Sequence, residues 1–208
     1  MTVREFQLRP GTQDENAWKE AYWWRKLDVK PGDRVLDLGA HIGCFIERVA
    51  LPAGAAAVLA VEPVEDNLAL LRANFSDDPR VEIKQAALTN NDEVAFLYLS
   101  NTSTMNHSLH RRRGREAVVV PAVTLQSLMG WYPTVIKCDV EGSEYETDWT
   151  NIPDCVRAIG VEFHSGRSAI HAPRIAEEIM DGGFEPLDGK VRFPQGAWHK
   201  NNVFVRPF

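Results

Sequence analysis

The sequence predicts a single α/β domain with a mostly parallel sheet, helices on both faces and an inserted β-hairpin. Short apolar runs that end in an acidic residue alternate with segments of helical periodicity, as in parallel strands joined by crossover helices. The alternation breaks once, where two β-rich runs follow each other without a helix. A chain of 208 residues with 44% hydrophobic and 25% charged residues fits one globular domain. Within that domain, residues 1–30 form an N-terminal part and residues 31–208 the main part.

The N-terminal part is expected to contain one aromatic-rich helix. Asp14 is placed to cap a helix over residues 15–27. In that helix Trp18, Tyr22 and Trp23 form one apolar stripe. The stripe can be buried against the domain or against a second copy of the chain, so a homodimer stays open.

The first strand, residues 34–38, runs into two spaced glycines and a helix over residues 43–51. Gly39 permits a tight turn and the close approach of a ligand to the backbone, because no Cβ is in the way. The second strand ends at Glu62, 23 residues after Gly39, where an acid can accept hydrogen bonds from both ribose hydroxyls. Asp37 ends the first strand in the same way. The two acid-tipped strands predict a nucleoside-binding site.

The residues after Gly39 distinguish between possible nucleosides. His41 stands where a dinucleotide fold has the middle glycine of G-x-G-x-x-G, which counts against an NAD-dependent oxidoreductase. The pattern from Asp37 to Gly43 resembles the first motif of class I S-adenosylmethionine (AdoMet) methyltransferases. This resemblance assigns Asp37 to the amino group of the methionine end and Glu62 to the ribose. A non-catalytic nucleoside-binding module would keep the glycines and stays an alternative.

The next elements continue the alternation and then interrupt it. A helix is expected to open with Pro63 at its first position. After a third strand near residues 81–83, the small side chains around Ala87 could leave room for an adenine ring or could serve close packing of the backbone. The runs 94–99 and 117–120 then form a hairpin with a long loop, and Thr124 caps the helix after it.

The hairpin loop, residues 100–116, is long enough to expect a function for it. Its hydroxyl, amide and imidazole groups suit a polar, hydroxylated acceptor, with His107 as a substrate-binding residue. Arg111 could hold a phosphate or carboxylate of the acceptor. The arginine cluster that begins there is the sole support for methylation of RNA. A net charge of −6 argues against nucleic acid as a partner.

A second chemical centre lies after the strand at residues 135–138. Asp139, Glu141 and Glu144 crowd six residues, which should raise at least one carboxyl pKa unless a cation lies among them. Glu162 and His164 share one face at the end of the next strand. If the two strands are neighbours, Asp139, Glu162 and His164 converge at the carboxyl edge of the sheet. These three could hold a divalent cation, although no dedicated motif assigns a metal ligand.

A helix near residues 169–180 and two short strands, 184–187 and 202–205, complete the chain. In order, VLDLGAHIG, AVEP, IKCDVEGSE and VEFH, with RPGTQDE near the N-terminus, resemble the FkbM family of AdoMet-dependent methyltransferases. The resemblance covers nearly the whole chain. It implies a Rossmann-like class I methyltransferase domain with a seven-stranded sheet, and O-methylation of a hydroxyl on a sugar or secondary metabolite. By position, the AdoMet-binding residues would be Asp37, Gly39, Ala40, His41, Gly43, Glu62, Ala87 and Asp139.

The chemistry of that reaction selects candidate catalytic residues. A hydroxyl is a poor nucleophile, so a base within hydrogen-bond reach accelerates its methylation. The candidates are Asp139, His164 and Glu141, in that order, with His107 a distant fourth. Glu162 is expected to bind the substrate together with His107 and Arg111.

The sequence also predicts a cytoplasmic protein without a membrane partner. The N-terminus lacks the apolar region of a signal peptide, and no apolar run approaches the ~18 residues of a membrane span. Three cysteines without C-x-x-C spacing are expected to be free thiols in a reducing compartment.

Overall fold

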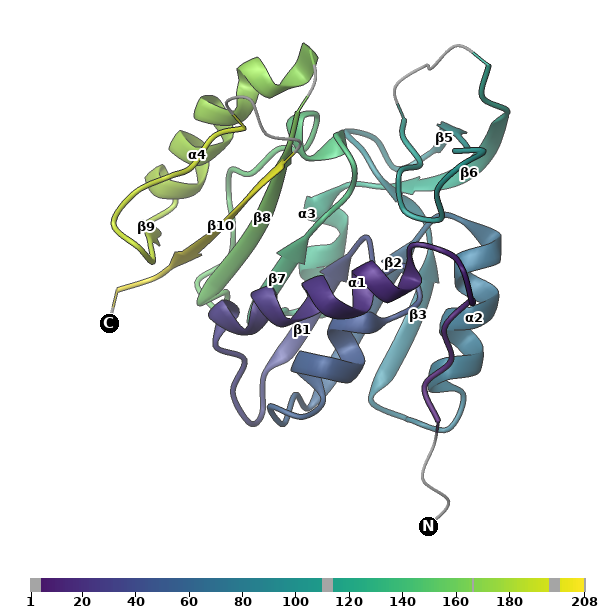
Figure 1. Cartoon of the computed structure of the whole chain (residues 1–208). Helices are drawn as coiled ribbons and strands as arrows, with labels where there is room; N and C mark the ends of the chain where they lie inside the picture. The colour runs from purple at the N-terminus through teal and green to yellow at the C-terminus, as the bar shows by residue number, and fades with distance from the viewer. Residues whose placement is uncertain (1–4, 110–113, 166, 195–198, 208) are drawn as a thin grey trace.

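The computed structural model describes residues 5–109, 114–165, 167–194 and 199–207. A seven-stranded sheet runs through the molecule in the order β3-β2-β1-β7-β8-β10-β9 (Figure 1). Neighbouring strands from β3 to β8 are parallel, and β10 is antiparallel to both β8 and β9. The predicted mostly parallel seven-stranded sheet is therefore confirmed. Its strands are β1 (Arg34–Leu38), β2 (Ala57–Glu62), β3 (Val81–Gln85), β7 (Val135–Cys138), β8 (Ala158–His164), β9 (Glu185–Pro186) and β10 (His199–Val205).

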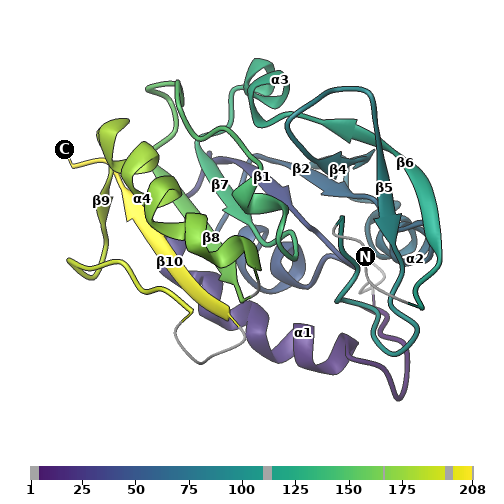
Figure 2. The ribbon, with the colours of Figure 1, turned by 90° about the horizontal axis from the view of Figure 1, so that it is seen from above.

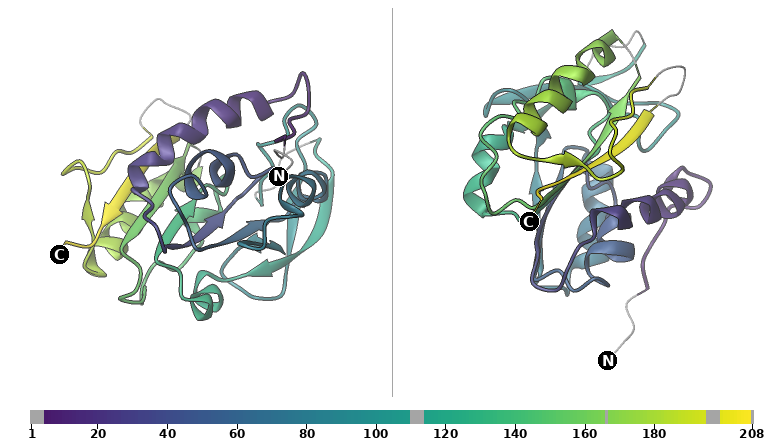
Figure 3. Two further views of the ribbon diagram at one scale, coloured as in Figure 1. Left: turned by 90° about the horizontal axis from the view of Figure 1, so that it is seen from below. Right: turned by 90° about the vertical axis from the view of Figure 1, so that its left-hand side faces the viewer.

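Helices cover both faces of the sheet, as predicted. Figure 3 shows α4 on one side of the sheet and α1 on the other. The α-helices are α1 (Asp14–Glu20), α2 (Glu65–Phe75), α3 (Leu125–Leu128) and α4 (Ala172–Asp181). The short 3₁₀ helices are η1 (Ala21–Leu27), η3 (Met129–Trp131), η4 (Ser143–Tyr145) and η5 (Arg167–His171), and η2 (Ile46–Ala50) is a π-helix.

Each face of the sheet has its own apolar core, because successive side chains of a strand point to opposite faces. Leu36 and Leu38 of β1 pack in the cluster that contains Ile175 of α4. Val35 packs in the other cluster, with Leu71 of α2. The continuous apolar runs of the sequence thus correspond to strands that are buried on both faces.

The predicted hairpin is also confirmed. Strand β5 (Val94–Tyr98) pairs antiparallel with β6 (Ala117–Val123), and β6 pairs in parallel with the short strand β4 (Ala87–Leu88). This second sheet lies at the same end of the molecule as α2 (Figure 2). Between β5 and β6 the loop folds back, and Ser108 forms a bridge with Tyr98. Thr124 caps α3 by accepting a hydrogen bond from the backbone N–H of Ser127 at 3.1 Å, as expected.

The N-terminal helix differs from its prediction. Its second half, η1, has the three-residue repeat of a 3₁₀ helix, so its buried side chains are Ala21, Trp24 and Leu27. The predicted stripe is confirmed only in part: Trp18 and Trp23 are half-buried against apolar clusters, whereas Tyr22 is exposed. Trp24 lies against Gly160 of β8, where an added Cβ would be 2.7 Å from the indole ring.

Two predicted helix starts also differ. Gln13 stands at the N-cap of α1 without a side-chain cap, and Asp14 is the first helical residue. The carboxylate of Asp14 is engaged by Arg9 instead of by the helix. Pro63 precedes the N-cap of α2, Val64, so it lies outside the helix that it was expected to open. At Asp14, the ion pair with Arg9 outweighs the preference of an acid for the N-cap position. At Pro63, the turn that holds Glu62 outweighs the preference of proline for the first helical position.

Candidate active site

Two cavities meet at the carboxyl ends of the central strands. The smaller has a volume of about 80 Å³ and is lined by side chains from the turns after β1 and β2, from β4 and from the hairpin loop. The larger has a volume of about 1420 Å³ and extends over β7, β8, β10 and the N-terminal helix. Gly39, His41, Met105, Asp139 and Glu141 line both cavities. The site is therefore one cleft with a narrow and a wide part, joined at the turns after β1 and β7.

The glycines after β1 serve contacts within the protein. Gly39 has a positive φ of +75°, and an added Cβ would lie 1.8 Å from the backbone oxygen of Asp139. The sequence predicted that a ligand comes close to the backbone at Gly39. In the structure, the turn after β7 comes close to it. An added Cβ at Gly43 would lie 2.2 Å from the ring of Phe75 in α2. The predicted roles of both glycines in binding a cofactor remain predictions.

Glu62 ends β2 and lines the small cavity. Its carboxylate accepts hydrogen bonds from the backbone N–H of His41 at 2.9 Å and of Val64 at 3.0 Å, and from the side chain of Asn67 at 3.2 Å. Burial nevertheless raises the pKa of Glu62 above its usual value. The turn after β1 and the start of α2 thereby hold this carboxylate at the cavity wall, where the sequence placed an acceptor for ribose hydroxyls.

Asp37 is fully buried and is not among the residues that line either cavity. Its Oδ1 accepts a hydrogen bond from Nζ of Lys137 at 2.9 Å. Lys137 also donates to the backbone oxygen of Gly39 at 3.0 Å and lies 3.8 Å from the carboxylate of Asp139. Burial acts to lower the pKa of Lys137, but the carboxylates of Asp37 and Asp139 outweigh burial and raise it, so the ammonium stays charged. The predicted contact of Asp37 with a methionine amino group stays a prediction.

Lys137 is a site residue that the sequence interpretation missed. It is the one charged residue in β7, whose four residues are all buried. A charged side chain inside an apolar strand is rare unless it has a partner, so this signal was present in the sequence.

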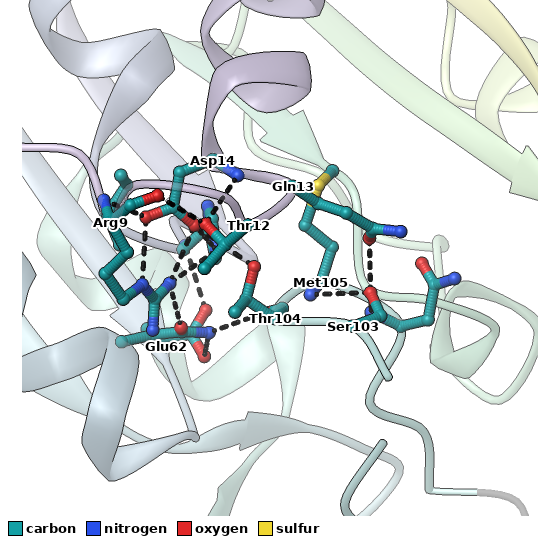
Figure 4. A network of polar contacts seen from close by, with 12 residues as sticks. Arg9, Thr12, Gln13, Asp14, Glu62, Ser103, Thr104 and Met105 are labelled. Atoms are coloured by element: carbon teal, nitrogen blue, oxygen red, sulfur yellow. Dashed lines mark hydrogen bonds and ion pairs between the residues drawn. The ribbon is translucent and has the colours of Figure 1, made fainter. Parts of the chain in front are cut away.

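The N-terminal segment reaches the site through a polar network (Figure 4). Arg9 forms a two-point ion pair with the buried carboxylate of Asp14, with N–O distances of 2.8 and 2.9 Å. Nη2 of Arg9 also donates to Oδ1 of Asn67 at 2.8 Å and lies 3.1 Å from Nε2 of His41. Thr104 of the hairpin loop donates to Asp14 at 3.1 Å and accepts from Asn67 through its backbone oxygen at 3.2 Å. The network ties the hairpin loop to the turn after β1.

His41 lies between the network and both cavities. Burial lowers its pKa to about 4, so its ring is neutral at neutral pH. Because Arg9 can only donate, Nε2 of His41 accepts and the ring proton is on Nδ1. That Nδ1 is buried and has no partner among the described residues. The turn therefore presents a hydrogen-bond donor that its own surroundings leave unused.

Carboxylates gather at the other side of the junction. The predicted pairing of β7 with β8 is confirmed, and ligand-capable atoms of Asp139, Glu162 and His164 all lie within 4.8 Å of one another. Nε2 of His164 is 3.6 Å from Asp139 and 3.7 Å from Glu141. Oε1 of Glu162 is 2.8 Å from Nδ1 of His199. Asp139, Glu162 and His164 are therefore close to one another in the structure, as the sequence predicted.

The expected rise in carboxyl pKa is present in this cluster. Burial, reinforced by the charge of Asp139, raises the pKa values of Glu141 and Glu162 to about 7. Burial also acts to raise the pKa of Asp139, but the charges of Lys137 and His164 outweigh it and hold this carboxylate ionised. Burial acts to lower the pKa of His164, and its contact with Glu144 raises that pKa well above its usual value.

The remaining predicted site residues have different positions. Ala87 and His107 line the small cavity. Nδ1 of His107 accepts a hydrogen bond from the backbone N–H of Ser100 at 3.0 Å, so this ring helps to shape the loop. Ala40 lines the large cavity, as does Glu162. Arg111 lies outside the described residues.

Comparisons with known proteins identify the family of this fold. Residues 37–147, more than half of the chain, match the sequence model of the family described as Methyltransferase FkbM domain. This stretch includes the turns after β1 and β2 and the D-V-E-G-S-E segment from Asp139 to Glu144. A shorter stretch is 45% identical over 58 residues to ribosomal RNA small subunit methyltransferase A of Parasynechococcus marenigrum, and covers 28% of this chain and 19% of that protein.

Solved structures show the same fold. A structure titled methyltransferase FkbM from Methylobacillus flagellatus KT is 14% identical, with a TM-score of 0.51, over 90% of this chain and 50% of that chain. A protein in the NADB-Rossmann superfamily from Streptococcus agalactiae is 12% identical, with a TM-score of 0.52, over 97% of this chain and 70% of that chain. None of the helices in the described ranges has the length and apolar character of a membrane span. By its sequence match, the chain belongs to the FkbM family of AdoMet-dependent methyltransferases.

Proposed function

We propose that the chain is an AdoMet-dependent methyltransferase that methylates a hydroxyl group of a small polar acceptor, such as a sugar or a secondary metabolite. The observation that carries this proposal is the junction of the two cavities at Asp139 and Glu141. One cavity has the features of a nucleoside site, and the other has carboxylates and room for a second molecule. A methyl group passing between two substrates needs such a junction.

The residues of the small cavity fit the adenosine part of AdoMet. Glu62 supplies a fixed acceptor at the end of β2, and Ala87 and Leu88 supply small or apolar surface beside it. The unused donor on His41 suits a carboxylate at the methionine end. The cavity of about 80 Å³ is smaller than the roughly 300–1,000 Å³ of typical ligand pockets, so side chains of the hairpin loop must move when a nucleoside enters.

Asp139 is the residue best placed to take the acceptor proton. AdoMet supplies an activated methyl group for transfer in line to the acceptor oxygen. Asp139 lines both cavities and is ionised, so its carboxylate can accept a hydrogen bond from the hydroxyl and then its proton as the oxygen–carbon bond forms and the sulfur–carbon bond breaks. Lys137 fixes the turn that carries Asp139.

His164 and Glu141 occupy different positions around that base. Glu141 lines both cavities and stays a candidate base. His164 lines the large cavity, and its Nδ1 is held by Glu144 at 3.1 Å. We assign His164 and Glu162 to the wall of the acceptor site.

RNA is the second candidate acceptor. The 58-residue match to a ribosomal RNA methyltransferase favours it. The net charge of −6 opposes it, because binding to phosphates relies on a basic surface.

Transfer of a radiolabelled methyl group from AdoMet tests the proposal. Acceptor pools of sugars, hydroxylated metabolites and RNA are compared, with Asp139→Asn and the fully exposed Asp154→Asn as a matched control. We expect labelling of a hydroxylated small molecule, a loss of turnover of about 100-fold or more in Asp139→Asn, and no change in Asp154→Asn. Labelling of RNA alone, or full activity of Asp139→Asn, would contradict the proposal.

A further inference from the structure

We propose that Asp139, Glu162 and His164 bind one divalent cation of the Mn²⁺ type in the wall of the large cavity. The site itself follows from the arrangement of these side chains, whereas the action of the cation on an acceptor rests on the proposed function. The three residues come from the neighbouring strands β7 and β8, where Cys138 pairs with Val161.

The distances between the side chains fit an ion between them. All three offer a ligand atom within 4.8 Å of the others. Nε2 of His164 lies 3.6 Å from Oδ1 of Asp139, which is too long for a hydrogen bond. Ligands of an octahedral ion with bonds of about 2.1 Å lie roughly 3 Å apart when adjacent and roughly 4 Å apart when opposite. The separation of 3.6 Å lies between these two values, so a small movement of either side chain would make both of them ligands of one ion.

His164 is oriented as a metal ligand usually is. Its Nδ1 lies 3.1 Å from Oε1 of Glu144, and the same oxygen accepts a hydrogen bond from the backbone N–H of His164 at 2.9 Å. The other oxygen of Glu144 accepts from Gly142 at 2.8 Å. Glu144 is fully buried, so the ring is held with Nε2 towards Asp139 and Glu141. Metal-binding histidines commonly use their second nitrogen in this way.

Glu162 has similar support. Its Oε1 contacts His199 of β10 at 2.8 Å, which leaves the other oxygen for a ligand bond. Carboxylate oxygens of Asp139 and Glu162 lie within 4.8 Å of each other. Two carboxylates tolerate this proximity when a proton or a metal ion lies between them.

The charges around the cluster also favour a cation. Asp139, Glu141 and Glu162 face the same space. Among the described lysines and arginines, the one that pairs with this cluster is Lys137, at 3.8 Å from Asp139, and it is closer to Asp37 at 2.9 Å. The rings of His164 and His199 also pair with these carboxylates when protonated, and a divalent ion would take the place of the proton on Nε2 of His164.

The mixture of ligands indicates the type of ion. Carboxylates suit Mg²⁺, Ca²⁺ and Mn²⁺, whereas an imidazole favours the transition metals, and Mn²⁺ satisfies both preferences. In the proposed reaction such an ion would bind the acceptor hydroxyl and lower its pKa, so that the proton passes more readily to the oxygen of Asp139 that does not bind the ion.

The test is a titration of the untagged protein with Mn²⁺, in which electron paramagnetic resonance reports the free ion. We expect one site per chain. Asp139→Asn and Glu162→Gln should each weaken binding by about tenfold or more. Glu20→Gln is the matched control, because Glu20 lines the same large cavity but is exposed and outside the cluster. Its affinity for Mn²⁺ should equal that of the wild type.

A second measurement identifies the imidazole. Pulsed resonance of the bound Mn²⁺ should show a directly coordinated nitrogen, and this signal should be lost in His164→Gln. Circular dichroism checks that each variant is folded. If His164→Gln does not fold, the Mn²⁺ affinity of Glu162→Gln still tests the cation site.

Two results would overturn the cation site: no saturable binding by the wild type up to about 1 mM Mn²⁺, or wild-type affinity in both carboxylate variants. A parallel titration with AdoMet separates the two proposals. Mn²⁺ binding without AdoMet binding would contradict the proposed function and support the cation site. AdoMet binding without Mn²⁺ binding would support the proposed function and contradict the cation site.

Discussion

Arg9 and Asp14 form a two-point ion pair, with Nε and Nη2 of the guanidinium 2.8 and 2.9 Å from the two carboxylate oxygens. The carboxylate is fully buried, and the same guanidinium contacts His41 and Asn67. The pair thus connects the N-terminal segment to the turn after β1 and to the residue that holds Glu62. The pair joins the first and last residues of the R-P-G-T-Q-D run, which explains why an arginine and an aspartate stand at its two ends.

Loss of this pair should destabilise the protein. In Asp14→Asn the partly buried guanidinium keeps its charge without a charged partner, so we expect a loss of about 3 kcal/mol in the free energy of unfolding. Urea denaturation measures it. Asp28→Asn is the control, because the ion pair of Asp28 with Lys30 is exposed and its loss should change stability by less than about 0.5 kcal/mol. Equal stability of the two variants would show that the Arg9–Asp14 pair contributes nothing.

The pH dependence of stability should report the buried neutral ring of His41. Its pKa is 6.5 in the unfolded chain and about 4 in the folded one. Between these values the unfolded state binds a proton that the folded state does not, so stability is full above pH 6.5 and is lost as the pH falls towards 4. The loss should reach about 3 kcal/mol at most. His41→Asn should lack this component in denaturation curves across that pH range, and parallel curves for the two proteins would contradict the assignment.

Gly39 should not tolerate a side chain. In Gly39→Ala the new Cβ would lie 1.8 Å from the backbone oxygen of Asp139, at a backbone angle that other residues rarely adopt. We expect a loss of about 3 kcal/mol or more in thermal unfolding. Gly130→Ala is the control, since an added Cβ there has nothing within 4 Å. If both variants melt together, the turn after β7 is not as close to Gly39 as the structure shows.

The buried pair of Lys137 and Asp37 should show strong coupling. Lys137→Met leaves the fully buried Asp37 without its cation, and a loss of about 3–5 kcal/mol is expected. Asp37→Asn in the Lys137→Met background removes that uncompensated charge, so the double variant should be more stable than Lys137→Met alone. A double-mutant cycle from chemical denaturation measures the coupling, and strictly additive losses would argue against the pair.

The parts of the fold that depend on local patterns were predictable. The apolar runs that end at Leu38 and Glu62 gave the correct strands, and two β-rich runs without a helix gave the hairpin of β5 and β6. The convergence of Asp139, Glu162 and His164 was also predictable, because parallel neighbours bring their carboxyl ends to one edge.

The parts that depend on distant contacts were not. Arg9 is 58 residues from Asn67 and Thr104 is 90 residues from Asp14, and no local signal pairs them. The buried face of the N-terminal helix was predicted only in part, because the second half of the helix has a period of three residues. The sequence marks Lys137 as an unusual charge within an apolar strand, but it does not identify its partner, Asp37, which lies 100 residues away.

Calorimetric titration of the purified protein with AdoMet, S-adenosylhomocysteine and NAD tests most directly whether the small cavity binds the nucleoside of AdoMet. Wild type should bind the first two with micromolar affinity and should not bind NAD. Glu62→Gln should weaken binding of AdoMet by about tenfold or more, because a neutral amide with one accepting oxygen replaces the carboxylate at the ribose position, whereas the exposed Glu65→Gln should not. No binding of AdoMet by the folded protein, or tight binding of NAD in its place, would show that this cavity is not an AdoMet site.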